Sequence, residues 1–444
     1  MTETIAQAPR LAHERPEAAA PEWITEAAAL PLSLKLVLMS VFLPEAMSFF
    51  VAGLRLTATR VIFLVLAPVV FIRFGQKIAT GRYLFVASDV FVPLASLWMF
   101  LGPTVVNGLD DALTHSGPVV LEYLIGYLAT RVLLTHDGQA LSFVSFLCVA
   151  ICVVVLDASL DTLTGRYLTR EVVPMITGFQ PPFHPADAFR FGLLRATGPI
   201  EHPILFGFIC AIGLLFASAA DIALRPLCIV VCALGVVIAF SSAPEQSVLM
   251  GFAFLVYGRM AAGMAGRWMW LCGSAAVGVA IVLFSVPSPF GHIIEAMTLD
   301  PSTGYYRLYI WNTIGPLVLE NPYFGVLQQS VDQAYKGSID SVWLVLAVTY
   351  GVPCSVLTAL GMIGSCSLPT RGPGAWLTPS ASRLGMTLGI VIFLIMLAGF
   401  TVHFWGSLWI LIGLLVGLRA HLGELGALNA ADRLIGRGED VEAG

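Results

Sequence analysis

Long apolar runs separated by short polar segments dominate the chain. A helix needs about 20 mostly apolar residues to cross a bilayer, and most of these runs approach that length. The pattern therefore predicts an all-α polytopic membrane protein with about 12 transmembrane helices. The predicted spans are 31–52, 57–74, 83–102, 117–133, 140–158, 201–219, 222–240, 246–263, 268–286, 339–363, 384–402 and 404–420.

Two parts of this prediction leave alternatives open. The run 246–263 is short and contains Arg259. The last two runs are separated only by Thr401-Val402-His403-Phe404, so they form either a tight helical hairpin or one bent segment.

The composition agrees with a membrane protein. Of the 444 residues, 57% are hydrophobic and only 11% are charged, whereas a soluble domain carries about 25% charged residues. The net charge of -5 includes no basic patch, so we expect no nucleic-acid partner. The eight cysteines lie within or near apolar runs without histidine or carboxylate partners, so we expect no disulfide framework, no metal site and no cofactor.

The basic residues predict the orientation. With the N-terminus inside, most of the 23 lysine and arginine residues fall in cytoplasmic segments, as the positive-inside rule requires. We therefore expect both termini to be cytoplasmic, with a disordered N-terminal tail over 1–30, a membrane domain over 31–420 and a C-terminal tail over 421–444. Two long loops, about 159–200 and 287–339, then lie outside. Long loops inside a compact domain are uncommon and usually functional.

The first long loop ends in an arginine-containing motif. Arg190 and Arg195 precede Glu201 and His202, which lead into a predicted span. A guanidinium group grips phosphate oxygens through two parallel hydrogen bonds and never loses its charge. Arg190 has Asp187 three residues earlier, so a structural ion pair competes with a functional role there. For Arg195 that alternative is weaker, because glycine, proline and aromatic residues surround it.

The second long loop contains an amphipathic helix with Arg307 and Trp311. Arg307 has no acidic residue three or four positions away, which favours a functional role. Trp311 lies one turn later, where it can stack on the guanidinium or on a sugar ring. The stripe of Ile310, Ile314 and Leu317 predicts that this helix lies against the membrane or the transmembrane bundle.

Asp340 and Ser341 stand at the entry to the next predicted span. Serine and aspartate are good N-cap residues, so helix capping is one interpretation of both. The other is that Asp340 is a general base, because a carboxylate at an apolar boundary has its pKa raised towards the working range.

Three acidic residues, Glu45, Asp89 and Glu122, fall inside apolar runs. Such residues usually pair inside the bundle or mark a pathway. Asp89 lies near Arg82, so pairing with the cytoplasmic charges is one interpretation of it.

Three motifs in this order resemble those of the O-antigen ligase and O-antigen or exopolysaccharide polymerase family, the O-antigen ligase-related membrane proteins. The resemblance spans about 31–420 and is most specific over 190–420. It is carried by Arg195-Ala196-Thr197-Gly198-Pro199-Ile200-Glu201-His202-Pro203, by Arg307 to Trp311 with Glu320-Asn321-Pro322-Tyr323-Phe324-Gly325-Val326, and by Asp340-Ser341 followed after nine residues by Gly351.

The resemblance implies a GT-C-like architecture and a metal-independent, inverting glycosyltransferase in the bacterial inner membrane. Its donor would be a glycan on undecaprenyl pyrophosphate, and its partners would include membrane lipid and a chain-length regulator. It implies catalytic roles for the three residues Asp340, Arg307 and Arg195. It implies substrate binding by Arg190, Trp311, His202 and Glu201.

Two departures favour a polymerase over a ligase. Asp340 stands where ligases have histidine, and Cys354 replaces the second glycine of that motif. We therefore expect a polymerase that joins glycan repeat units, with a ligase acting on lipid A-core as the alternative. A lipid-linked glycan transporter or flippase and an assembly subunit of the envelope are the other classes. The chain has no clear internal repeat, which disfavours the transporter.

Overall fold

Helices form most of the computed structural model, which describes residues 29–442 apart from 52–53, 180–187, 286–300, 373 and 405. Nearly all of the predicted N-terminal tail, Asp187 and the start of the second long loop lie outside the described residues. The first nine helices are α1 (Leu32–Val41), α2 (Ala58–Ala79), α3 (Ser88–Asn107), α4 (Leu109–Asp111), the π-helix η2 (Ala112–Ser116), α5 (Gly117–Leu133), α6 (Asp137–Thr164), α7 (Leu168–Thr177) and α8 (Pro203–Ala219).

The second half of the chain is also helical, and two short hairpins complete the structure. The later helices are α9 (Arg225–Ile238), α10 (Ser242–Met260), α11 (Arg267–Ser285), α13 (Pro301–Glu320), α14 (Gln328–Ala334), α15 (Val342–Tyr350), α16 (Val352–Gly364), α17 (Pro379–Ala398) and α18 (Gly406–Glu442). The antiparallel hairpins are β1 (Ser48–Val51) with β2 (Leu54–Thr57), and β3 (Phe189–Arg190) with β4 (Leu193–Leu194).

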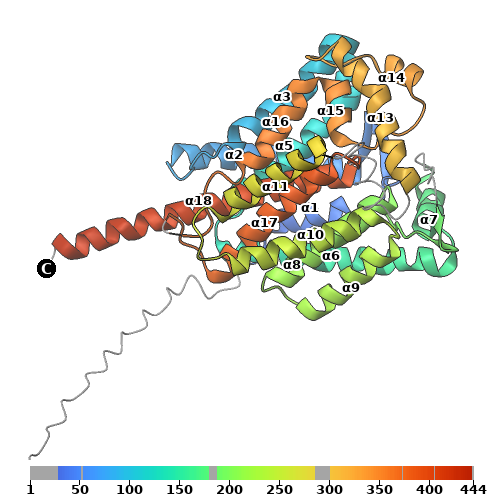
Figure 1. Ribbon diagram of the computed structural model, residues 1–444. Helices are drawn as coiled ribbons and strands as arrows, with labels where there is room; N and C mark the ends of the chain where they lie inside the picture. Colours follow the sequence, from blue (N-terminus) through green and yellow to red (C-terminus); the bar gives the residue numbers. More distant parts are fainter. Residues whose placement is uncertain are drawn as a thin grey trace, which may run out of the picture.

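Five helices are long and apolar enough to cross a membrane among the described residues: α2, α3, α6, α17 and Leu408–Leu434 of α18. Shorter apolar helices include α1, α8, α9 and α16. The chain is therefore a mostly helical protein with the apolar helices of a membrane protein. Figure 1 shows α13, α14 and α15 together on one side of the bundle, with α18 projecting beyond its far end.

The central contact of the bundle is between α5 and α18, and glycines make it close. A Cβ on Gly413 would lie 2.6 Å from the carbonyl oxygen of Tyr123, and one on Gly417 would overlap the carbonyl of Tyr127. The hydroxyl of Thr130 donates to the Leu414 carbonyl across the same contact, at 2.9 Å. Small residues spaced four apart let two membrane helices approach closely.

Three predicted spans differ from the structure. The run 31–52 is helical only over α1, because its second half pairs with 54–57 in a hairpin after Pro44. The run 339–363 divides into α15 and α16 at Gly351, whose φ of 91° a helix cannot contain. The last run continues as α18 to Glu442, through residues that we expected to form a polar tail.

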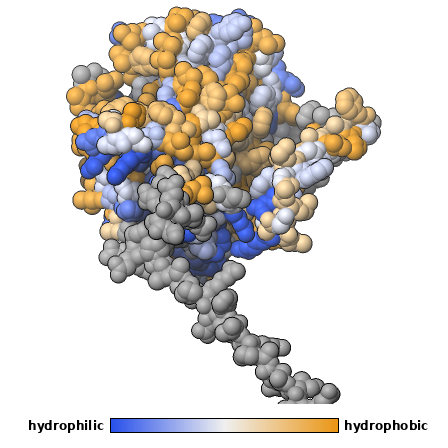
Figure 2. All heavy atoms as spheres, turned by 90° about the vertical axis from the view of Figure 1, so that its left-hand side faces the viewer, coloured by the Kyte–Doolittle hydropathy of each residue, from blue (hydrophilic) through white to orange (hydrophobic). Residues whose placement is uncertain are grey.

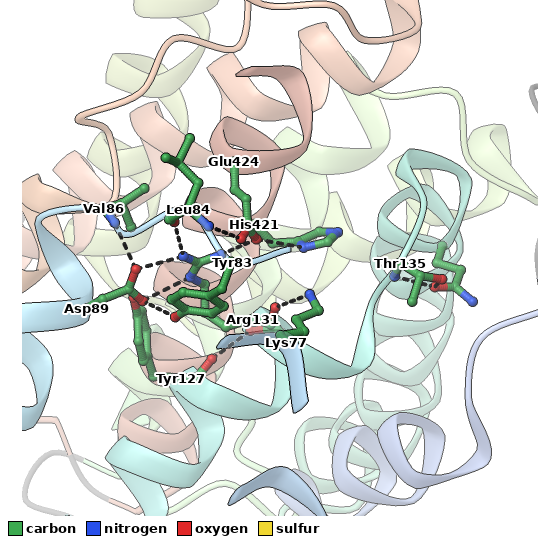
Figure 3. Close-up of polar contacts among 12 residues, drawn as sticks. Lys77, Tyr83, Leu84, Val86, Asp89, Tyr127, Arg131, Thr135, His421 and Glu424 are labelled. Atoms are coloured by element: carbon green, nitrogen blue, oxygen red, sulfur yellow. Dashed lines mark hydrogen bonds and ion pairs between the residues drawn. The ribbon is translucent and has the colours of Figure 1, made fainter. Parts of the chain in front are cut away.

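A buried ionic network joins α3, α5 and α18 near the far end of the bundle (Figure 3). Arg131, fully buried, donates to both carboxylate oxygens of Asp89, at 3.0 and 2.7 Å, and to Glu424 at 2.5 Å. The hydroxyls of Tyr83 and Tyr127 also donate to Asp89, at 2.6 and 2.5 Å. Asp89 therefore pairs with Arg131 and not with its sequence neighbour Arg82.

Candidate functional site

The β3–β4 hairpin positions the first two arginines of the candidate site. Phe191 and Gly192 both have positive φ, which suits the tight two-residue turn of a hairpin. Arg190 donates to the carbonyl of Phe240 at 3.0 Å, and the Arg195 Nε donates to the carbonyl of Ala239 at 3.1 Å. Both side chains therefore bind backbone carbonyls just after α9, and the Arg195 side chain is buried.

Asp161, near the end of α6, shapes the segment after Arg195. Its carboxylate accepts hydrogen bonds from the backbone nitrogens of Gly198 at 2.8 Å, Thr197 at 3.2 Å and Leu168 at 3.1 Å. These bonds tie the start of α7 and the approach to α8 to one buried side chain. Sequence reasoning missed Asp161, because its partners lie up to 37 residues away.

His202 is buried within electrostatic range of four guanidinium groups. It is the N-cap of α8, and its Nδ1 accepts a hydrogen bond from the backbone nitrogen of Ile204 at 3.2 Å. Burial, followed by the positive charges of Arg195, Arg170, Arg307 and Arg190, lowers the pKa of His202 to about 3. Four positive charges that act on one region favour the binding of an anion, although acidic side chains, with Glu201 first, also act on Arg170. We call Arg170, Arg190, Arg195 and Arg307 the arginine cluster.

The cluster draws on segments far apart in the chain. Arg190 and Arg195 come from the β3–β4 hairpin, Arg170 from α7 and Arg307 from α13. Arg170 donates to the carbonyl of Ile200. Sequence reasoning did not single out Arg170, because Glu171 follows it and makes it resemble an ordinary surface charge. In the structure Glu171 pairs with Arg166 instead.

Arg307 contributes a buried nitrogen to the cluster. Its Nε is buried and has no hydrogen-bond partner among the described residues. Burial lowers the pKa of Arg307, Asp340 raises it, and Arg190 lowers it. Asp340 therefore lies near Arg307, although the two do not form an ion pair within 4 Å. A buried donor without a partner is costly unless a ligand satisfies it.

Asp340 does not cap the helix that follows it. The N-cap of α15 is Ser341, whose hydroxyl accepts from the backbone nitrogen of Leu344 at 3.4 Å and donates to the carbonyl of Gly399 at 3.0 Å. The half-buried Asp340 has its pKa raised by burial, and Arg307 and the Ser338 side chain partly oppose this. The structure thus assigns the capping role to Ser341 alone.

Three tyrosine side chains lie together, and one of them, Tyr335, is near Asp340. The rings of Tyr306 and Tyr309 lie 6.2 to 6.4 Å from that of Tyr335, and the Tyr306 and Tyr335 hydroxyls are hydrogen-bonded. Trp311 points elsewhere: its indole nitrogen donates to the carbonyl of Phe400 at 3.2 Å, and its ring stacks with that of Phe400.

The two later motifs meet in space. The backbone nitrogen of Val326 donates to the Val348 carbonyl at 2.8 Å, and that of Val352 donates to the Pro322 carbonyl at 2.7 Å. Segment 322–326 thereby pairs with the backbone that is left free where α15 ends and α16 begins. Both motif glycines, Gly325 and Gly351, have positive φ, and a Cβ on either would overlap the backbone of the other segment.

The α13 helix packs on α15 through its predicted apolar stripe. Ile310 and Ile314 are buried against Leu344 and Val348, in a small core separate from that of the main bundle. Of the two predicted surfaces for this stripe, the membrane and the transmembrane bundle, the structure shows packing on α15. Helix α13 ends at Glu320, just before Pro322.

A second polar group lies beside the cluster at the start of α18. Arg60 pairs with Glu122 at 2.9 Å, and Arg55 pairs with Glu45 at 3.4 Å, so both of these predicted intramembrane acids are paired. Arg60, Glu122 and Glu45 line a small cavity of about 30 Å³ together with Glu201. A polar cavity of this size holds about one or two water molecules and is too small for a substrate.

Searches of protein-family models and of curated proteins find no match for this chain.

Proposed function

We propose that this protein is an inner-membrane glycan polymerase that transfers repeat units from undecaprenyl pyrophosphate to an acceptor sugar hydroxyl. The observation that supports it most is the convergence of four arginines from three separate segments around one neutral histidine. A diphosphate is the anion that such a group of planar, permanently charged donors suits best.

The proposed reaction needs a leaving group and a base. The arginine cluster holds the pyrophosphate, and each charge-assisted hydrogen bond contributes about 1.5–3 kcal/mol. The acceptor hydroxyl oxygen attacks the anomeric carbon of the donor sugar, and the bond from that carbon to the pyrophosphate oxygen breaks. The electron pair leaves with undecaprenyl pyrophosphate, whose growing charge the arginines stabilise. Asp340 takes the hydroxyl proton, and the configuration at the anomeric carbon inverts.

The contacts suit these roles. Arg307 retains an unused buried donor, and Asp340 lies near it with a raised pKa. A base with a raised pKa is a stronger proton acceptor at neutral pH than an ordinary aspartate. The exposed rings of Tyr306 and Tyr309 offer faces on which the acceptor sugar can stack. Because Trp311 points to Phe400, we assign it to positioning the 399–404 segment in this scheme.

The test uses purified protein in detergent with lipid-linked repeat units. Gel electrophoresis measures the length of the glycan chains, and mass spectrometry measures the released undecaprenyl pyrophosphate. Arg307→Gln and Arg195→Gln are expected to reduce release at least 100-fold, the range seen when one electrostatic donor is removed. Arg166→Gln is the matched control, because this exposed arginine pairs only with Glu171. Equal activity in all four proteins would exclude the proposed clamp.

The same assay separates the alternatives. A ligase releases undecaprenyl pyrophosphate only when lipid A-core is supplied, and it forms no longer chains without it. A flippase releases none, and moves the intact lipid-linked glycan across vesicles instead.

A further inference from the structure

A large cavity lies at the opposite end of the bundle from the arginine cluster. It has a volume of about 670 Å³ and is lined by the ends of α8, α10 and α18, the start of α17 and the segment that precedes α17. Gly406, at the start of α18, adjoins Glu201 beside the arginine cluster, whereas Ala430 and Arg433 of the same helix line this cavity. At 1.5 Å per residue, the two ends are roughly 36 Å apart, about the thickness of a membrane.

Four arginines line this cavity: Arg259, Arg371, Arg383 and Arg433. None of its described lining residues is acidic. Arg383 pairs with Asp221 outside the lining, but Arg259, Arg371 and Arg433 have no carboxylate within 4 Å in the described part of the chain. Three arginines without ion pairs in one concave site create a strongly positive local potential.

The walls of the cavity are apolar. Leu255, Leu377, Met386 and Leu434 line it, together with Trp376, whose ring lies 3.1 Å from the guanidinium carbon of Arg433. Figure 2 looks onto this end of the molecule and shows patches of hydrophilic side chains beside apolar ones. A site lined by both arginines and apolar side chains suits an amphipathic anion.

We propose that this cavity binds the headgroup of an anionic phospholipid, with its acyl chains along the apolar wall. Basic pockets between the ends of membrane helices are known to take such headgroups. Arg259 lies in the last turn of α10 and Arg383 in the first turns of α17, so both charges lie at helix ends. Phospholipid headgroups and soluble phosphates share an anionic phosphate group, and the apolar wall favours the lipid.

The test measures lipid affinity by native mass spectrometry of the delipidated full-length protein. Phosphatidylglycerol is titrated against phosphatidylcholine, which carries no net charge. We expect a preference for phosphatidylglycerol that weakens about fivefold for each of Arg259→Gln, Arg371→Gln and Arg433→Gln, because one basic residue contributes about that factor at a membrane surface. Arg82→Gln is the matched control, since this exposed arginine belongs to the same end of the bundle and does not line the cavity.

Three results would overturn the proposal. One is equal affinity for the two lipids, and another is unchanged phosphatidylglycerol affinity in all three cavity variants. The third result is that inorganic phosphate or glycerol 3-phosphate displaces phosphatidylglycerol at millimolar concentration. The cavity would then be a site for soluble phosphates and not for a lipid. Size-exclusion profiles establish that the variants are folded. The assay contains no glycan substrate, so its outcome is independent of the proposed polymerase activity.

Discussion

Replacing Arg131 by methionine tests whether the ionic network in Figure 3 holds the far end of the bundle together. Methionine fills similar space but leaves the carboxylates of Asp89 and Glu424 buried without their shared cation. It also removes the hydrogen bond from Arg131 to the Leu84 carbonyl, at 3.1 Å. Segment 80–87 is therefore expected to detach from α5 and α18.

The size of the effect follows from the contacts. Arg131 makes three hydrogen bonds to carboxylate oxygens, and each contributes about 1.5–3 kcal/mol before the cost of desolvation. Desolvation offsets much of that sum in the intact network, but a variant without the cation retains two buried anions. Removing one partner of a buried pair costs about 3–5 kcal/mol. We expect Arg131→Met to lower the free energy of unfolding by that amount.

The assay is equilibrium unfolding in mixed micelles with increasing SDS. Arg166→Met is the control, because its pair with Glu171 is exposed and should contribute less than about 1 kcal/mol. Adding Glu424→Gln to Arg131→Met should recover part of the loss, since one of the two buried anions is then neutral. If the free energy of unfolding of Arg131→Met lies within about 1 kcal/mol of that of the wild type, the network does not stabilise the bundle.

Four further predictions concern the candidate site. Asp340→Asn should lower turnover 10²- to 10⁴-fold, the usual contribution of a general base. In the wild type, activity should fall as the pH drops through the raised pKa of Asp340, and Arg307→Gln should move that limb of the pH profile to higher pH, because Arg307 lowers this pKa. Gly351→Ala should destabilise the protein by about 1–3 kcal/mol in the SDS assay, since its φ is 91° and its Cβ would overlap Tyr323. Ser341→Ala should cost about 1 kcal/mol through loss of the N-cap, whereas Asp340→Asn should leave stability nearly unchanged.

Local apolar length predicted many helices well, because a long apolar run has few other stable conformations in a bilayer. The run 117–133 became α5 with the same bounds, and 201–219 became α8 within two residues. The predicted spans that were wrong are changed by contacts with other segments of the chain. The end of the run 31–52 turned into a strand because a partner strand lies next to it, and 339–363 broke at Gly351 because segment 322–326 supplies its hydrogen bonds there.

For the candidate site, the sequence predicted the residues that belong to motifs and missed those outside them. Sequence reasoning singled out Arg190, Arg195 and Arg307, and the structure places all three near His202. It missed Arg170, because the adjacent Glu171 makes this position resemble an ordinary surface charge. It also missed the ion pair between Arg131 and Glu424, which lie 293 residues apart. Helix spacing predicts only pairs three or four residues apart in one helix.

The contact between the two later motifs explains how the protein can fix Arg307 relative to Asp340 without an ion pair between them. Arg307 belongs to α13 and Asp340 precedes α15, and these helices share a small apolar core. Segment 322–326, which follows α13, is hydrogen-bonded at both sides of the α15–α16 break. The two side chains are thus held by backbone contacts at glycine positions that admit no side chain. In a reaction that requires a base and a guanidinium at a set separation, positioning by rigid backbone leaves both groups free for substrate, whereas a direct ion pair would occupy them.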